Sequence, residues 1–279
     1  MATVLITGCS SGFGKLAAVE FARRGDTVFA SMRDTAKAGP LRSDAERAGV
    51  SLDVIALDVT DGASAERAVA DVVQRAGRLD VLVNNAGAGT HGPVEAYDDD
   101  EVVAVFDTNV IGVMRTVRAA VPRMREQGGG TIINVSSLAG KVTPPFGGVY
   151  SASKHALEAI SDALYWELHP LGIRVVVIEP GGFETEFSNN RHVARRYTEG
   201  SPYAGLDRRF DASLARLPGR DAPADPQDVA NAIVDAAKAE QPKRRYLVGQ
   251  DAQMIGGLAK QMSDEDFEKA MRTTLDIWD

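Results

Sequence analysis

Cysteine is almost absent from this sequence of 279 residues, in which Cys9 is the only one. A single thiol cannot form an intrachain disulfide and cannot build a thiolate metal site by itself. Long hydrophobic runs are lacking too, since none approaches the roughly 20 residues that span a bilayer. The sequence also begins without a basic segment followed by a cleavage site. We therefore expect a cytoplasmic protein that is neither secreted nor inserted in a membrane.

Excess positive charge is also missing, because 31 lysines and arginines against 39 acidic residues give a formal net charge of −8. Such a surface repels a phosphate backbone, and no basic stripe interleaved with aromatics offsets it. Aromatic residues make up only 6%, but the hydrophobic fraction of 44% supplies a large aliphatic core. The composition favours a globular protein and excludes nucleic acid as an expected partner.

Clustered metal ligands are a further absence. The candidates Cys9, His91, His155 and His169 show no ligand spacing, such as paired histidines one helical turn apart beside an acid. We expect no metal site.

What the sequence does contain is a regular alternation of short β-branched runs and amphipathic stretches of helical length. This alternation is typical of βαβ units around a parallel sheet. Strands are expected at residues 3–7, 27–31, 54–57, 81–83, 132–135, 174–178 and 245–248. Helices are expected at residues 12–24, 36–48, 63–76, 99–127, 150–169 and 228–239. The pattern predicts a doubly wound α/β fold with a seven-stranded parallel sheet, that is, a Rossmann fold.

One segment, residues 183–226, breaks this alternation. It is polar, rich in arginine and without a long apolar run, and a segment of that length in a compact domain is usually functional. We interpret it as a partly helical lid over the active site. The whole chain, residues 1–279, is expected to form a single domain that ends in a C-terminal tail at residues 250–279.

A glycine-rich loop, Thr7-Gly8-Cys9-Ser10-Ser11-Gly12-Phe13-Gly14, joins the first expected strand to the first expected helix. A dinucleotide pyrophosphate can rest there on exposed amides at the positive end of the helix. Glycine is needed because a Cβ would hold the phosphates away; the alternative is an ordinary turn between strand and helix. The candidate cofactor-binding residues of this loop are Gly8, Ser10, Ser11, Gly12, Phe13 and Gly14.

The T-G-x-x-x-G-x-G spacing of this loop resembles that of the classical short-chain dehydrogenases/reductases. Further stretches fit that family in order: Asp58-Val59, Asn84-Asn85-Ala86-Gly87, Asn109, Ser137 with Tyr150-x-x-x-Lys154, and Pro180-Gly181. Within the family, residues 28–34, 85–95 and 150–158 look most like the hydroxysteroid and retinol dehydrogenase branch. The resemblance implies an oxidoreductase that interconverts a ketone or aldehyde and an alcohol.

Tyr150 is the candidate proton donor to the carbonyl oxygen. A free tyrosine has a pKa of about 10, so a neighbouring cation is expected to favour the phenolate. Lys154 can be that cation, because residues four apart on a helix share one face. Without the other motifs, such a pair could equally be a solvated helix face.

Two further catalytic candidates follow from their places in the pattern. Ser137 follows the expected strand at 132–135, at the carboxyl edge of the sheet, where its hydroxyl can orient and polarise the substrate oxygen. The family's spacing of thirteen positions to Tyr150 selects Ser137 over the adjacent Ser136, which we expect to be structural. Asn109 lies within the expected helix at 99–127, where the resemblance implies a proton relay through Lys154. A capping or packing amide is the competing interpretation for Asn109.

The resemblance also implies further contacts with the dinucleotide. Asp58 resembles the residue that bonds the adenine amino group, and the stretch after the fourth strand is expected beside the adenosine and ribose. The turn after the sixth strand is expected beside the nicotinamide carboxamide, although proline and glycine also simply end strands. The candidates are Asp58, Val59, Asn85, Ala86, Gly87, Pro180, Gly181, Phe183 and Thr185, with Tyr150 and Lys154.

Cofactor choice in this fold is set at the end of the second strand. An acid there favours NAD by accepting hydrogen bonds from the ribose, but here Met32 holds that position and Arg33 follows. Arg33 can pair with the 2′-phosphate, and Ser11 can add a hydrogen bond. We therefore predict that NADP(H) is preferred over NAD(H). In the alternative interpretation Arg33 faces solvent and Asp34 neutralises it.

The substrate is the least defined part of the prediction. Residues between the serine and the tyrosine suggest an apolar wall, formed by Val142, Pro144, Pro145, Phe146 and Val149. The lid arginines could bind an anionic substrate, but isolated charges more often face water, and we favour the second interpretation. These arginines are Arg191, Arg195, Arg196, Arg208 and Arg209.

The sequence leaves two alternative functions open, a sugar-nucleotide enzyme and a regulator, and it also predicts a homo-oligomer. A sugar-nucleotide epimerase or dehydratase shares the tyrosine and lysine but normally has a different glycine spacing and a longer substrate domain. A cofactor-sensing regulator would be expected to lack Ser137, Tyr150 or Lys154, and none is missing. The family commonly pairs the helices expected at 99–127 and 150–169 between subunits, which predicts a homodimer or homotetramer.

Overall fold

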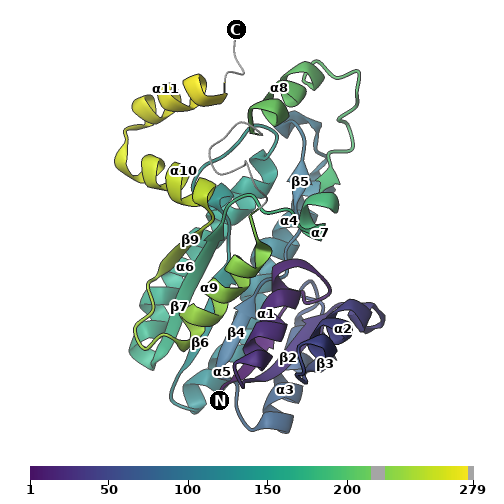
Figure 1. The fold of residues 1–279 in the computed structure, drawn as a ribbon, viewed down its shortest axis with the longest axis vertical. Helices are drawn as coiled ribbons and strands as arrows, with labels where there is room; N and C mark the ends of the chain where they lie inside the picture. Colours follow the sequence, from purple (N-terminus) through teal and green to yellow (C-terminus); the bar gives the residue numbers. More distant parts are fainter. Residues whose placement is uncertain (215–223, 276–279) are drawn as a thin grey trace.

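The computed structural model describes residues 1–214 and 224–275. Within these ranges seven strands form one parallel sheet in the order β3-β2-β1-β4-β6-β7-β9 (Figure 1). The strands are β1 (Thr3–Ile6), β2 (Thr27–Met32), β3 (Asp53–Ala56), β4 (Val81–Asn84), β6 (Gly130–Val135), β7 (Ile173–Pro180) and β9 (Arg245–Val248). The strand order reverses between β1 and β4, so the predicted doubly wound fold is confirmed.

Helices cover both faces of the sheet. One face packs against α1 (Gly12–Arg23), α2 (Gly39–Arg47) and α9 (Pro226–Lys238), and the other against α3 (Gly62–Ala76), α5 (Gly112–Glu126) and α6 (Gly148–Leu168). In β1, Val4 and Ile6 contribute to the first core and Leu5 to the second. Burial on both faces explains why the strands are continuous apolar runs rather than alternating ones.

Two of the predicted helices have a different form in the structure. The single helix expected at residues 99–127 consists of α4 (Asp99–Phe106), a π-helical turn (Asp107–Ile111) and α5. In the π-helical turn, the Asn109 side chain accepts a hydrogen bond from the Ala88 amide and donates one to the Ala88 carbonyl, which holds Asn109 inward. The helix expected at 36–48 begins as a 3₁₀ turn (Thr35–Ala38), capped by Asp34, before α2 starts.

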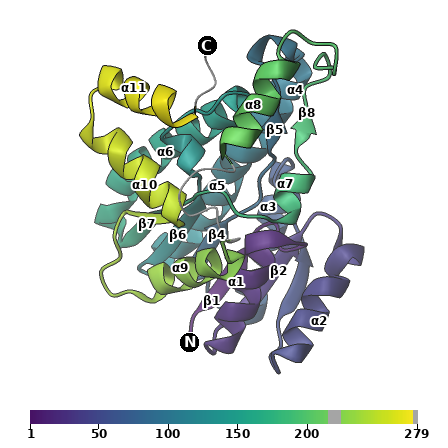
Figure 2. The same ribbon diagram turned by 45° about the horizontal axis from the view of Figure 1, so that its top comes forward.

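The remaining elements lie over the carboxyl ends of the strands (Figures 1 and 2). Residues 183–214 contain α7 (Glu186–Asn189), β8 (His192–Val193) and α8 (Ala204–Leu214). The small strand β5 (Thr90–His91) pairs in parallel with β8. The predicted tail is instead helical, with α10 (Gln250–Gln261) and α11 (Asp264–Leu275). Residues 215–223 of the expected lid and 276–279 of the expected tail lie outside the described residues.

Candidate active site

Two cavities meet at the carboxyl edge of the sheet, where open α/β sheets bind ligands. The larger has a volume of about 880 Å³ and mostly apolar walls; the smaller, of about 400 Å³, lies over the glycine loop. Ser137 lines only the larger cavity and Lys154 only the smaller, whereas Tyr150 lines both. Tyr150 therefore stands where the two cavities join. The other residues that line both are Phe13, Gly89, Ser136, Thr185 and Phe187.

Tyr150 and Lys154 lie one turn apart near the start of α6. The Lys154 Nζ atom is 5.7 Å from the centroid of the Tyr150 ring. It donates a hydrogen bond of 2.9 Å to the carbonyl oxygen of Val135 at the end of β6. The i to i+4 spacing thus brings the ammonium group to the phenol ring, and the hydrogen bond to β6 fixes the long lysine side chain in place.

Burial governs the protonation of both groups. It raises the pKa of Tyr150 to about 12, and a hydrogen bond with the Ser137 hydroxyl partly offsets this rise. Burial lowers the pKa of Lys154 to about 8, against the opposing effect of the negative charge on Glu158. Burial of the phenol thus opposes the phenolate, and the role of Lys154 in favouring that form stays a prediction. At neutral pH Tyr150 is a phenol with a proton to donate.

Two buried carboxylates, Glu158 and Glu179, form a charged cluster with Lys141 and Arg245, and Glu158 lies one helical turn after Lys154. Lys141 Nζ lies 2.9 Å from Glu158 Oε2 and 3.4 Å from Glu179 Oε1. Arg245 Nε lies 3.0 Å from Glu158 and 3.2 Å from Glu179. Burial raises the pKa of Glu179 to about 7; the charge of Glu158 adds to this rise, and the two cations oppose it. The cluster ties β7 and β9 to the helix that carries the lysine.

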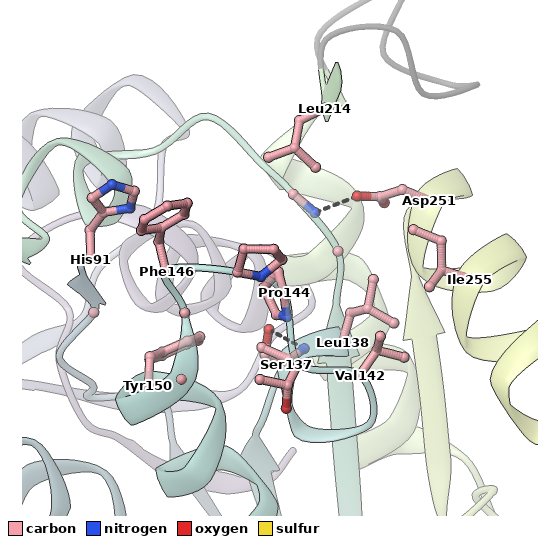
Figure 3. Close-up of a pocket in the computed structure, with 18 of the residues that line it drawn as sticks. His91, Ser137, Leu138, Val142, Pro144, Phe146, Tyr150, Leu214, Asp251 and Ile255 are labelled. Atoms are coloured by element: carbon pink, nitrogen blue, oxygen red, sulfur yellow. Dashed lines mark hydrogen bonds between the residues drawn. The ribbon is translucent and has the colours of Figure 1, made fainter. Parts of the chain in front are cut away.

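Ser137 follows β6 and begins a 3₁₀ turn, Leu138–Gly140. Its Oγ accepts a hydrogen bond of 3.1 Å from the amide of Ala139, and it lines the larger cavity beside Leu138 and Val142 (Figure 3). The neighbouring Ser136 Oγ instead faces Gly140, where a Cβ would lie 2.9 Å away. Ser137 is thus the serine whose hydroxyl is placed beside the substrate cavity.

Asn109 is buried in the π-helical turn. Its Oδ1 accepts a hydrogen bond of 2.7 Å from the Ala88 amide, and its Nδ2 donates to the Ala88 carbonyl at 2.9 Å and to Ser153 Oγ at 3.0 Å. The side chain joins the loop after β4 to α6 and does not bond to Lys154. In this structure it has the packing role that competes with the predicted relay.

The glycine loop fits a dinucleotide pyrophosphate. Gly8 has φ of +74°, and a Cβ on it would lie 2.8 Å from the Ala86 Cα atom. A Cβ on Gly14 would lie 2.3 Å from Asn85 Nδ2, which donates to the Gly8 carbonyl at 3.1 Å. These short distances show that the loop packs closely against the residues that follow β4. The Ser11 side chain does not cap α1, so the first amides of that helix stay available for phosphate oxygens. Gly14 and Asn85 thus support the loop, and Gly14 lines neither cavity.

The end of β2 presents a cation at the smaller cavity. The strand ends at Met32, and the exposed Arg33 that follows lines this cavity. Asp34 accepts a hydrogen bond of 3.0 Å from the Ala36 amide and caps the following 3₁₀ turn; it makes no ion pair with Arg33. Arg33 is thus exposed, as in the alternative interpretation, but Asp34 does not pair with it.

Asp58 lines the same cavity, together with the predicted Val59. Partial burial raises the pKa of Asp58, but hydrogen bonds from the hydroxyl and amide of Thr60 and the charge of Arg33 lower it below its usual range overall. Asp58 is thus a fixed acceptor at neutral pH. Prediction from the sequence missed four polar residues that also line this cavity, although three of them adjoin predicted positions: Thr60, Thr108, Ser136 and Asn190.

The turn after β7 is held from α10. Asp251 Oδ2 accepts a hydrogen bond of 2.7 Å from the Gly182 amide, and a Cβ on Gly181 would lie 2.0 Å from Asp251 Oδ1 (Figure 3). This close approach explains the glycine. Sequence reasoning missed Asp251, because 69 positions separate it from the amide that it accepts from. The predicted residues of this turn line the larger cavity: Pro180, Gly181, Phe183 and Thr185.

The apolar wall was largely placed as expected. Val142, Pro144, Pro145 and Phe146 line the larger cavity, but Val149 does not; it packs in a separate buried cluster with Tyr97 and Ala194. The prediction for Val149 was therefore wrong, because the first turn of α6 points it away from the cavity. The C-terminal helices, for which the sequence predicts no role, add four apolar residues to the wall of this cavity: Ile255, Phe267, Met271 and Leu275.

The lid arginines mostly face away from the cavity. Arg195 pairs with Asp98 at 3.0 Å and with Asp100 at 2.9 Å, and Arg196 also pairs with Asp98. These contacts fasten the lid to the acidic start of α4. Arg191 alone among the five lines the larger cavity.

The described residues hold no group of histidine, cysteine and acidic side chains that could bind a metal ion. Nor does any helix in the described ranges have both the length and the apolar character needed to cross a membrane.

Comparison with known proteins places this geometry in a family. The family model described as short chain dehydrogenase matches residues 2–195. The chain is 39% identical over 201 residues to the 3-ketodihydrosphingosine reductase of Bacteroides thetaiotaomicron, covering 72% of this chain and 71% of that one. It is 38% identical over 259 residues to 17-beta-hydroxysteroid dehydrogenase type 1 of Homo sapiens, covering 88% and 76%.

Solved structures agree with the sequence comparison. A short-chain dehydrogenase from Streptomyces avermitilis matches with a TM-score of 0.78 and 34% identity, covering 98% of each chain. Other solved structures of similar fold include complexes with NADP and with NAD. The chain therefore belongs to the short chain dehydrogenase family of oxidoreductases, which bind a nicotinamide dinucleotide.

Proposed function

We propose that this chain is an NADP(H)-dependent oxidoreductase that interconverts a ketone or aldehyde and an alcohol on a largely apolar substrate. The observation that carries the proposal is the place of Tyr150 at the junction of the two cavities. A proton donor at that point reaches a carbonyl held in the apolar cavity while it borders the space above the glycine loop. When bound there, a nicotinamide dinucleotide supplies or accepts the hydride.

We assign a separate role to each of the three other catalytic candidates, Ser137, Lys154 and Asn109. Ser137 polarises the substrate oxygen from the larger cavity and shares a hydrogen bond with Tyr150. Lys154, on the side of the smaller cavity, stabilises negative charge as it develops on the phenol oxygen. Asn109 positions the loop after β4 and, through the π-helical turn, leaves irregular backbone near Lys154 for a proton relay.

The protonation state of Tyr150 decides which half of the reaction its phenol can assist. Burial raises the pKa of its phenol to about 12, so the group is protonated at neutral pH. A protonated phenol can donate to a carbonyl oxygen, as reduction requires, whereas oxidation of an alcohol needs the phenolate. Near neutral pH the phenol is therefore ready to assist ketone reduction, whereas the net direction of the reaction depends on the ratio of reduced to oxidised nucleotide.

The lid and the C-terminal helices close the substrate cavity. The Phe187 ring of α7 lies 5.7 Å from the Tyr150 ring, and Phe210 of α8 packs with Phe146 and Leu275. A roof of apolar side chains excludes water from the reacting carbonyl, which strengthens the hydrogen bonds there. We assign the described residues 183–214 and 224–226 as a lid on a single domain and add α10 and α11 to the same roof.

The compounds for which two relatives are named are of a size and polarity that suit the apolar cavity. A hydroxysteroid and a ketodihydrosphingosine, the compounds that two of their names give, each carry an alcohol or ketone on a large apolar skeleton. A cavity of about 880 Å³ holds a skeleton of that size. We propose the same class of substrate for this chain.

A panel of apolar ketones, supplied with NADPH and separately with NADH, tests the proposed function. We expect nucleotide consumption that depends on the ketone, rises with the apolar area of the ketone and is faster with NADPH. The spectrophotometric rate of nucleotide oxidation is the measurement. A rate of nucleotide oxidation that is the same with and without each ketone of the panel would contradict the proposal.

Assembly is a further prediction, because apolar side chains are exposed on the helices expected to pair. Val103 on α4 is 64% exposed and Trp166 on α6 is 68% exposed. Ile111 in the π-helical turn and Met114 on α5 are each 41% exposed. Burial of such residues favours a homodimer or homotetramer. Light scattering at micromolar concentration is expected to give a multiple of the chain mass, and Met114→Glu to reduce it. A strictly monomeric mass for the wild type would refute the assembly.

A further inference from the structure

His91 is a polar side chain in the wall of the mostly apolar substrate cavity. It ends the short strand β5, and its ring stacks on Phe146 with centroids 5.7 Å apart and planes inclined by 26°. Figure 3 shows the two rings side by side above Tyr150. The reaction as derived above does not use this imidazole.

The backbone around His91 fixes the position of its ring. The Gly92 amide donates a hydrogen bond of 2.9 Å to the Phe146 carbonyl, which ties the loop after β5 to the cavity wall. Phe146 itself has φ of +60°, a conformation that a bulky residue rarely adopts. Strain of this kind persists only where the surroundings enforce it, and it is concentrated at functional sites.

A carboxylate from the lid holds the outer nitrogen of His91. Asp207 Oδ2 on α8 lies 2.9 Å from His91 Nε2 and accepts a hydrogen bond of 2.6 Å from the Tyr197 hydroxyl. The His91 and Asp207 side chains are only 18% and 14% exposed. Because a carboxylate can only accept, Nε2 must carry a proton. Nδ1 is then an acceptor in the neutral ring and a donor in the charged one.

Nδ1 has no hydrogen-bond partner among the described residues. Of the other polar side chains that line the cavity, the buried Thr90 and Ser136 hydroxyls also have no partner, whereas three are engaged with the backbone. Asp251 accepts from the Gly182 amide, Ser188 donates to the Phe183 carbonyl, and Arg191 donates to the Ser188 carbonyl. His91 thus brings an unsatisfied polar atom into an apolar wall, and a substrate group that bonds to it would be selected.

We infer that His91, oriented by Asp207, is a specificity-determining residue that binds a hydroxyl group of the substrate away from the reacting carbonyl. A hydroxyl both donates and accepts, so it matches Nδ1 in either protonation state of the ring. The inference rests on the proposed function and narrows its substrate class to apolar ketones that carry a second, neutral polar group. Asp207 acts as a positioning residue for the imidazole.

The test compares two series of methyl ketones of increasing chain length, one with a terminal hydroxyl and one without. In the wild type, kcat/KM is expected to favour the hydroxylated ketone at the length that reaches His91, by about two- to tenfold, as for one neutral hydrogen bond. His91→Phe keeps a ring to stack on Phe146 and is expected to remove this preference. His91→Gln, which retains hydrogen-bonding groups, is expected to keep part of it.

The ratio of the two kcat/KM values separates specificity from general damage to the lid. A control variant in the same wall, Val142→Ala, is expected to change both ketones alike and leave the ratio unaltered. A wild type without preference at any chain length, or a preference that survives in His91→Phe, would overturn the inference alone. Failure to reduce either ketone would overturn the proposed function, and the inference with it.

Discussion

Replacing Tyr150 with phenylalanine is expected to lower kcat by about 10²- to 10⁴-fold, the usual contribution of a positioned general acid. The substitution removes only the hydroxyl at the junction of the two cavities, while the ring keeps its place against Phe187. Binding of the nucleotide should be nearly unchanged, because the glycine loop is untouched. Steady-state kinetics and a fluorescence titration with NADPH measure the two effects separately.

A control distinguishes loss of the acid from loss of any tyrosine hydroxyl. Tyr246 on β9 lines neither cavity, and its hydroxyl accepts a hydrogen bond of 3.0 Å from the Lys243 amide. Tyr246→Phe is expected to leave kcat close to that of the wild type. Should Tyr150→Phe retain activity within a few-fold of the wild type by the same assay, its role as proton donor would be wrong.

Arg33→Ala is expected to weaken NADPH binding by roughly ten- to a hundredfold, since hydrogen bonds to a charged group contribute about 1.5 to 3 kcal/mol. The guanidinium lines the smaller cavity at the end of β2, and the nearby Asp34 is engaged in capping the following turn. NADH lacks the 2′-phosphate, so its binding should hardly change. The Kd values of both nucleotides, measured for wild type and variant, check the prediction.

The matched control for Arg33 is Arg23, an exposed arginine in the last turn of α1 that pairs with Glu20. Arg23→Ala is expected to leave the Kd of both nucleotides unchanged. Equal affinity of the wild type for NADH and NADPH, or an equal loss for both in Arg33→Ala, would show that Arg33 does not select the phosphate.

The sheet and the cofactor side of the site follow from local sequence patterns. Each strand is an apolar run bounded by turn residues, because both faces of the sheet are buried, and such runs can be read without knowing their partners. The glycine loop and the Tyr150–Lys154 spacing are likewise local, since each lies within one turn or one helix. These features could therefore be predicted position by position.

The substrate side depends on contacts between distant parts of the chain, which local patterns do not contain. Asp251 reaches the turn after β7 across 69 positions, and Asp207 reaches His91 across 116. The C-terminal helices were expected only as a tail, because their apolar residues are spread among many charges. Their role in lining the cavity is evident only once the chain is folded. Desolvation of Tyr150 was missed for the same reason, since burial by the lid is a property of the assembled fold.

Transfer of deuterium tests the central claim most directly. An apolar ketone is reduced with NADPH that carries deuterium at its transferable position, and the alcohol is analysed by mass spectrometry and NMR. The account predicts that wild-type protein places a single deuterium on the carbinol carbon and that Tyr150→Phe forms almost no alcohol. Alcohol without deuterium at that carbon, or no alcohol from any apolar ketone with either nucleotide, would contradict it.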